Sequence, residues 1–148
     1  MKNSYVAKAT TTIDVPASKV WDALTKPELI KQYLFDTEVI TDWKVGSPIT
    51  YKGEWEGKAF EDKGKILKFE PEKSLASTHW SPLSGVPDTP ENYHTVTYEL
   101  TEMNAQTEVT ITQDNNASQE EADHSTQNWK TVLEGMKKLL ESQKAQMM

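Results

Sequence analysis

The pattern of apolar positions is clearest in the last long stretch of the chain, residues 118–146. Counting from Trp129, apolar side chains recur after three, four, seven, ten and eleven positions, at Val132, Leu133, Met136, Leu139 and Leu140. This spacing puts them on one stripe of an α-helix. Ser118 and Glu121 form a capping box at the predicted start. A lone helix cannot bury such a stripe against itself, so we expect a curved sheet to wrap it.

Most of the preceding chain alternates between apolar and polar positions, which predicts β-strands. The predicted strands are residues 5–15, 39–45, 49–55, 58–69, 74–80, 93–102 and 105–113. Most of the connections between successive strands after residue 39 are short, so the sheet is expected to be antiparallel. In residues 58–69, Phe60 and Ile66 share one parity, whereas Leu67 and Phe69 share the other. We therefore expect a β-bulge near Gly64.

Two short helices are predicted between the first two strands. Residues 17–24 place Val20, Trp21 and Leu24 at helical spacing, and a second helix starts at residues 25–28. The one long connection, residues 81–92, contains three prolines and should form a stiff loop at one mouth of the sheet. The predicted fold is α+β: a seven-stranded curved antiparallel sheet around a long C-terminal helix, in a single domain over residues 1–148.

Composition narrows the function classes. The 148 residues carry a net charge of −7, all 16 basic residues are Lys, and there is no Cys. An acidic chain without Arg is a poor candidate for binding nucleic acid, phosphate or anionic membrane. Without Cys there is no disulfide, thiolate nucleophile or cysteine metal site. The N-terminal residues show no apolar signal region and no stretch approaches a membrane span, so a cytoplasmic location is expected.

Several local motifs, taken in order, resemble a known superfamily. They are residues 13–24 followed by Lys26-Pro27-Glu28, residues 64–71, Leu75 and Trp80, residues 94–100, residues 107–113, and Trp129 with Leu133. Together they resemble the helix-grip superfamily that includes START and Bet v 1 proteins, and more closely its activator-of-Hsp90-ATPase-like branch. The resemblance covers nearly the whole chain. It departs at Asn128, where the family often has Gly.

The resemblance implies a seven-stranded sheet gripping the C-terminal helix, with a cavity between them. It does not imply a reaction, because members include ligand carriers, cyclases and a co-chaperone domain. Our leading hypothesis is binding of an apolar or aromatic small molecule in that cavity, without catalysis, cofactor or metal. The alternatives are an activator or stress-response protein that acts on an Hsp90-type chaperone ATPase, and a cyclase or lyase. Monomer and homodimer are both left open.

The expected ligand-binding residues are mainly inward aromatic side chains, with part of the helix stripe. They are Tyr33, Phe35, Tyr51, Trp55, Phe60, Trp80, His94, Tyr98, Trp129, Val132, Leu133 and Met136. The simpler interpretation is that these rings fill the core. His94 shares parity with Val96 and Tyr98, and it is the titratable group that a cyclase would need. His79 has the opposite parity to Trp80. The carboxylates Glu54, Glu56, Glu61 and Asp62 are expected on a solvated edge.

Overall fold

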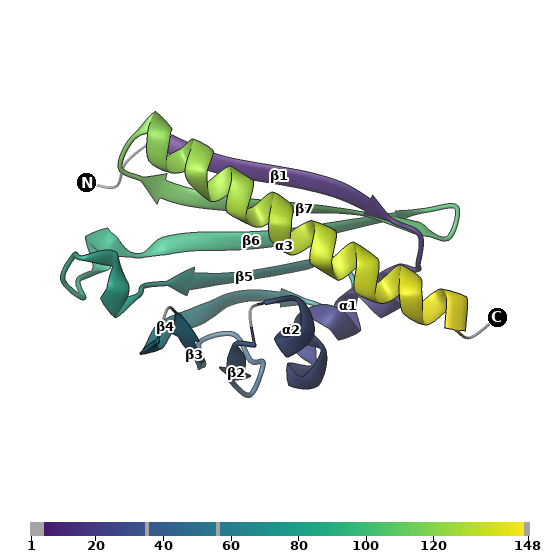
Figure 1. Ribbon diagram of the computed structural model, residues 1–148, viewed down its shortest axis with the longest axis horizontal. Helices are drawn as coiled ribbons and strands as arrows, with labels where there is room; N and C mark the ends of the chain where they lie inside the picture. The colour runs from purple at the N-terminus through teal and green to yellow at the C-terminus, as the bar shows by residue number, and fades with distance from the viewer. Residues whose placement is uncertain (1–4, 35, 56, 147–148) are drawn as a thin grey trace.

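The computed structural model describes residues 5–34, 36–55 and 57–146, and within these residues one seven-stranded sheet carries a long helix across one face (Figure 1). The strands are β1 (Tyr5–Ile13), β2 (Glu38–Ile40), β3 (Pro48–Trp55), β4 (Lys58–Glu70), β5 (Ser74–His79), β6 (His94–Met103) and β7 (Gln106–Asn116). The helices are α1 (Ala17–Thr25), α2 (Pro27–Tyr33) and α3 (Gln119–Gln146), with short 3-10 turns η1 (Pro82–Ser84) and η2 (Pro90–Asn92).

The strand order is β1-β7-β6-β5-β4-β3-β2, and every neighbouring pair is antiparallel. Figure 1 shows α3 running the length of the sheet, with α1 and α2 near its C-terminal half. This arrangement confirms the predicted α+β helix-grip fold. None of the helices in the described part of the chain combines the length and the apolar character that a membrane span requires.

The stripe predicted for α3 forms the centre of the core. Val132, Leu133, Met136 and Leu140 are buried against inward side chains of the sheet, with Ile13, Ile66, Val109 and Ile111 among the sheet's contributions. The predicted cap is also present, since Ser118 Oγ accepts the backbone N–H of Glu121 at 3.1 Å. The Glu121 carboxylate reaches back to the N–H of Ala117, one residue before the expected Ser118.

The strand predicted over residues 39–45 is shorter than expected. Only Glu38–Ile40 pairs with β3. The next residues turn on local hydrogen bonds: Thr41 Oγ1 accepts the N–H of Trp43 at 3.4 Å, and Asp42 Oδ1 accepts the N–H of Lys44 at 3.3 Å. Such side-chain acceptors compete with a strand ladder for the backbone. The turn brings the Trp43 ring to 6.3 Å from that of Phe69.

A bulge interrupts β4, but not at Gly64. The register with β5 shifts between Ile66 and Lys68, so Leu67 is the extra residue. Leu67 therefore points outward and is exposed, whereas Ile66 is buried and the Phe69 ring packs 5.2 Å from Trp21. The predicted parity conflict is real, and a bulge resolves it three residues later than expected.

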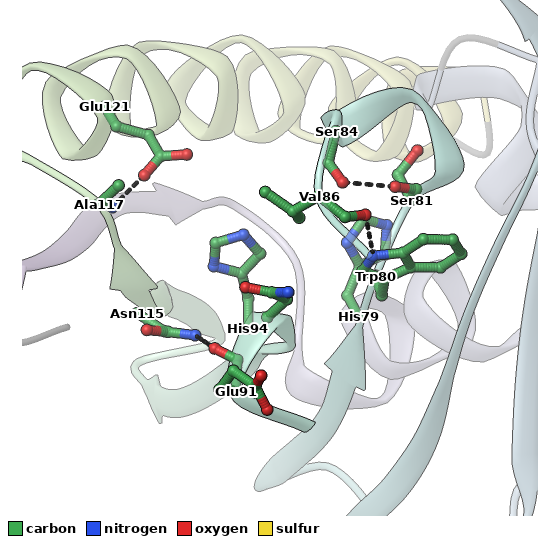
Figure 2. A pocket seen from close by; sticks show the side chains of 11 residues that line it. His79, Trp80, Ser81, Ser84, Val86, Glu91, His94, Asn115, Ala117 and Glu121 are labelled. Atoms are coloured by element: carbon green, nitrogen blue, oxygen red, sulfur yellow. Dashed lines mark hydrogen bonds between the residues drawn. The ribbon is translucent and has the colours of Figure 1, made fainter. Parts of the chain in front are cut away.

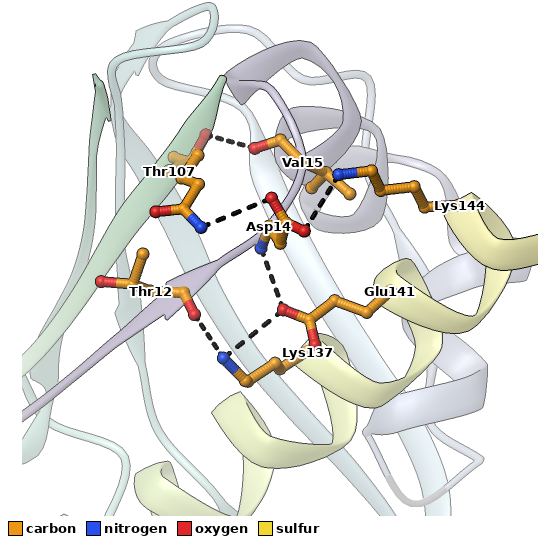
Figure 3. A network of polar contacts seen from close by, with 8 residues as sticks. Thr12, Asp14, Val15, Thr107, Lys137, Glu141 and Lys144 are labelled. Atoms are coloured by element: carbon orange, nitrogen blue, oxygen red, sulfur yellow. Dashed lines mark hydrogen bonds and ion pairs between the residues drawn. The ribbon is translucent and has the colours of Figure 1, made fainter. Parts of the chain in front are cut away.

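A polar network fastens the end of α3 to the link between β1 and α1 (Figure 3). Glu141 Oε2 accepts the backbone N–H of Asp14 at 2.9 Å, and the Asp14 carboxylate lies 3.0 Å from Lys144 Nζ. Lys137 Nζ donates to the carbonyl oxygen of Thr12 at 2.6 Å. These contacts hold the C-terminal half of α3 against the end of β1 and the link to α1.

Candidate functional site

A cavity of about 220 Å³ lies between the sheet and the N-terminal half of α3. Its lining is mostly aromatic and aliphatic: Leu34, Thr37, Tyr51, Phe60, Asp62, His79, Val96, Tyr98, Gln113 and Trp129. A wider hollow of about 510 Å³ shares six of these residues and adds Ser81, His124, Ser125, Asn128 and Val132. The shared residues show that the two spaces adjoin, so the inner cavity leads into a larger outer one.

Trp129 forms one wall of the cavity and is held in place by a side chain of the sheet. Its Nε1–H donates to Gln113 Oε1 at 2.8 Å, and its ring meets the Tyr98 ring edge to face at 6.1 Å. The Gln113 amide in turn donates to Asn116 Oδ1 at 3.2 Å. A partly buried indole with its N–H paired is a rigid apolar surface, which suits contact with a flat ring.

The tyrosines on the inner side of the cavity are neutral phenols. Burial raises the pKa of Tyr98 well above its usual 10.0, and burial likewise raises the pKa of Tyr51. Tyr33 lies deeper, where its hydroxyl donates to the carbonyl oxygen of Ala23 at 2.7 Å. Tyr98, by contrast, makes no hydrogen bond through its hydroxyl to the described residues. The cavity therefore presents an O–H donor among apolar surfaces.

The polar end of the cavity is an Asp–His pair. His79 Nε2 lies 2.9 Å from Asp62 Oδ2, with 31% of the His79 and 14% of the Asp62 side chain exposed. Because an ionised carboxylate only accepts, Nε2–H is the donor and Nδ1 is the acceptor of a neutral ring. The Tyr51 ring packs edge to face on His79 at 5.5 Å. Asp62 Oδ1 is buried and has no hydrogen-bond partner among the described residues.

The expectation that Asp62 lies on a solvated edge is therefore wrong. In the β3–β4 ladder Asp62 is directly opposite Tyr51, and it shares the inward face with Phe60 and Ile66. Asp62 is an even number of residues from both Phe60 and Ile66, and in a strand this spacing predicts the same face. The prediction of a solvated edge gave more weight to the charge of Asp62. The sequence reasoning also missed His79. It took Trp80 as an inward residue of β5, which left His79 on the outward face.

A second hollow, of about 150 Å³, lies at the end of the sheet under the loop between β5 and β6 (Figure 2). Trp80 lines it, stacks on Tyr93 with ring centroids 6.5 Å apart, and donates from Nε1 to the carbonyl oxygen of Val86 at 3.2 Å. His94 lines it too, and its Nδ1–H donates to the carbonyl oxygen of Asp114 at 2.8 Å. His79 lies directly opposite His94 in the β5–β6 ladder and lines both this second hollow and the inner cavity.

The structure thus divides the predicted binding residues into groups. Tyr51, Phe60, Tyr98 and Trp129 line the inner cavity, and Val132 lines the outer hollow. Tyr33, Leu133 and Met136 are buried in the core behind it. Trp80 and His94 lie in the second hollow instead of the cavity between sheet and helix. Phe35 and the side chain of Trp55 lie outside the described residues. The sequence reasoning missed Leu34, Thr37, Asp62, His79, Val96 and Gln113.

A metal centre has no support in the described part of the chain. No group of three or more His, Asp or Glu side chains there is placed to hold a metal ion. Asp62 and His79 are two neighbouring polar groups, fewer than the three protein ligands of a typical catalytic zinc site. The polar groups of the cavity lining include the Asp62–His79 pair at one end and the side chains of Thr37, Tyr98 and Gln113, and the rest of the lining is mostly apolar.

Comparison with solved structures places the fold in a large group. The solution structure of ChR145 from Cytophaga hutchinsonii is 52% identical, covers 98% of this chain and 99% of its own, and has a TM-score of 0.84. The Aha1 dimer from Colwellia psychrerythraea is 21% identical over 91% of this chain and 95% of its own, with a TM-score of 0.70. DynU16, from the dynemicin biosynthetic locus, is 16% identical over 94% of this chain and 48% of its own, with a TM-score of 0.77. The last two likenesses show the fold alone.

The sequence comparisons identify the family. A comparison with curated proteins gives no significant match. The family described as "Activator of Hsp90 ATPase homolog 1-like protein" matches residues 14–141, which run from the residue after β1 to the last turns of α3. This range includes every described residue that lines the inner cavity. The chain therefore belongs to the Activator of Hsp90 ATPase homolog 1-like family.

Proposed function

We propose that this protein binds an aromatic small molecule in the cavity between the sheet and α3, without catalysing a reaction on it. The observation that carries the proposal is the cavity itself, with Tyr51, Phe60, Tyr98 and Trp129 around about 220 Å³. Because the cavity connects to the outer hollow, water would occupy it when no ligand is bound, and the aromatic side chains would then lie against water. A bound aromatic ring would displace that water and remove apolar surface from contact with it, which is favourable by about 25 cal/mol per Å².

The shape of the site also supports a small molecule. The inner cavity adjoins the wider hollow beside His124, Asn128 and Val132, which provides a route from solvent. Small-molecule sites are typically concave and mostly apolar, with a few polar groups that set orientation. Here Asp62 and His79 supply those polar groups at one end.

A cavity-filling variant tests the proposal. Val96→Phe replaces a small side chain of the cavity lining with a bulky ring that would fill the cavity. Val45→Phe makes the same change at an exposed position. Isothermal titration with naphthalene-based ligands should show binding to the wild type and to the Val45 variant, and none to the Val96 variant. Retained cooperative melting of the Val96 variant shows that it folds. Equal binding by both variants, or no binding to the wild type, would refute the proposal.

The alternative of a chaperone partner draws its support from the description of the family. Its test is the ATP turnover of an Hsp90-type ATPase with and without this protein, and a rise in turnover is the result that would favour it. The enzymatic alternative, a cyclase or lyase in the cavity, would depend on Asp62 and His79 rather than on His94, because His94 lines the other hollow.

A further inference from the structure

We propose that the ligand carries a neutral hydroxyl on its aromatic ring and that this hydroxyl donates a hydrogen bond to Asp62 Oδ1. Asp62 would then determine which aromatic molecules the cavity binds. This inference rests on the proposed function of the same cavity and adds the chemical class of the ligand. Asp62 Oδ2 is already taken by His79 Nε2–H at 2.9 Å. Asp62 Oδ1 is buried without a partner among the described residues. A buried carboxylate oxygen is unfavourable unless a donor reaches it.

The position of Asp62 makes this residue part of the cavity wall, with its free oxygen enclosed at that wall. Asp62 lines both the inner cavity and the outer hollow, on the same strand face as Phe60. Its strand neighbours fix it there, because Tyr51 is directly opposite it in β3 and His79 anchors its other oxygen from β5. The contact with His79 limits the carboxylate to small rotations, and in our proposal such a rotation turns the free oxygen toward the ligand hydroxyl while Oδ2 stays beside His79.

The surrounding groups favour a hydroxyl over other donors. Tyr98 adds a neutral O–H that has no protein partner among the described residues, so the cavity offers a free donor as well as the free acceptor at Asp62. A hydroxyl both donates and accepts, whereas an ammonium group only donates. An aromatic carboxylate is disfavoured, because the described lining residues include no Lys to balance a second negative charge beside Asp62.

The test compares four naphthalenes substituted at the same ring position: naphthol, its methyl ether, methylnaphthalene and naphthoate. The ether keeps the oxygen as an acceptor and removes only the donor. By calorimetry the wild type should bind naphthol about tenfold more tightly than the ether or methylnaphthalene, the ratio expected for one hydrogen bond to a charged group. Naphthoate should bind most weakly. Equal affinities for naphthol and its ether would overturn the inference, as would naphthoate binding more tightly than naphthol.

A matched pair of variants assigns the preference to Asp62. In Asp62→Asn the amide oxygen should take the hydrogen bond from His79 Nε2–H and leave the NH₂ group, a donor, toward the ligand, so the ratio of naphthol to ether affinities should fall to about one while the affinity for methylnaphthalene stays unchanged. Glu61→Gln changes the adjacent carboxylate, which faces solvent beside Lys52, and should keep the full ratio. A preference that persists in Asp62→Asn would also overturn the inference.

The outcomes separate the two proposals. If methylnaphthalene and naphthol bind the wild type equally, the hydroxyl inference fails and the binding function stands. If none of the four ligands binds the wild type, both proposals fail. Because the ligand series uses the wild-type protein, the inference remains testable even if Asp62→Asn does not fold.

Discussion

Gly64 in β4 lies against the backbone carbonyl of Thr78 in β5. A Cβ atom at position 64 would come within 1.7 Å of the Thr78 carbonyl oxygen, far inside any real contact. The absence of a side chain lets the two strands approach at the point where Asp62, two residues earlier, meets His79, the residue after Thr78. Gly64 therefore has a positioning role for the Asp–His pair as well as a role in packing.

We predict that Gly64→Ala destabilises the fold by about 2 kcal/mol or more, because the backbone of β5 must move to admit the methyl group. Urea denaturation followed by circular dichroism measures this loss. The matched control is Gly135→Ala in α3, where the added Cβ would lie 3.5 Å from Tyr33 Cβ, an ordinary contact. That variant should gain about 0.5–1 kcal/mol from helix propensity. Equal effects at the two glycines would contradict the argument.

Trp129 and Trp80 report on different spaces, which locates the ligand. Trp129 lines the inner cavity, whereas Trp80 lines the second hollow. If the ligand binds between sheet and helix, Trp129→Phe should remove most of the ligand-induced change in tryptophan fluorescence, and Trp80→Phe should leave most of it. The reverse pattern would place the ligand in the second hollow. Calorimetry on the same variants separates loss of signal from loss of binding.

Glu141 is predicted to stabilise the docking of α3. Its carboxylate accepts the backbone N–H of Asp14 at 2.9 Å and lies 3.4 Å from Lys137 Nζ. Glu141→Gln weakens both contacts and should cost about 1 kcal/mol in the free energy of unfolding. Glu134→Gln makes the same change on an exposed position of the same helix and should cost almost nothing. A Glu141 variant as stable as the Glu134 variant would mean that the network in Figure 3 adds no stability.

The Asp14–Lys144 contact predicts a loss of stability in acid. A hydrogen bond from Lys144 is the main cause that holds the pKa of Asp14 below its usual 3.8. The folded state thus favours the ionised carboxylate, and the stabilisation is present above pH 3.8 and is lost as the pH falls through the lowered value. Melting temperatures across this window should fall less for Asp14→Asn and for Lys144→Gln than for the wild type. Parallel curves for all three proteins would argue against this coupling.

The buried tyrosines predict a loss of stability in alkali. Burial raises the pKa of Tyr98 well above the usual 10.0, so the folded state disfavours the phenolate. The stabilisation is present below pH 10.0 and is lost as the pH rises toward the raised value in the folded protein. Tyr98→Phe should change stability little at neutral pH, because its hydroxyl has no protein partner among the described residues, and should reduce the alkaline loss. Thermal melts of the wild type and Tyr98→Phe at neutral pH and above pH 10.0 measure this difference. An equal loss of stability in alkali for the two proteins would contradict the prediction.

Tyr33→Phe is the contrasting variant. Its hydroxyl donates to the carbonyl oxygen of Ala23 at 2.7 Å, so removing it leaves a buried acceptor unpaired. This variant should lose about 1–2 kcal/mol already at neutral pH. A Tyr33 variant as stable as the Tyr98 variant would show that the Ala23 contact contributes little.

Local periodicity was enough to predict the elements and their order. Apolar residues at helical spacing from Trp129 to Leu140 specify which face of α3 is buried, because that spacing depends only on neighbouring residues. Alternation in the strands, with short connections between most of them, likewise predicted the antiparallel sheet. The resemblance to the family then followed from these motifs in their observed order.

Pairing between distant segments decided the rest. Asp62 and His79 are 17 residues apart, and only the registers of β4 with β3 and β5 bring them together at the cavity. His94 does face inward as its parity predicted, but its place at the end of β6 puts it in the second hollow. The sequence by itself determined which side chains are apolar or polar on each element. Only the tertiary structure decided which of them share a cavity, because register and bulges, such as the one at Leu67, depend on contacts between strands.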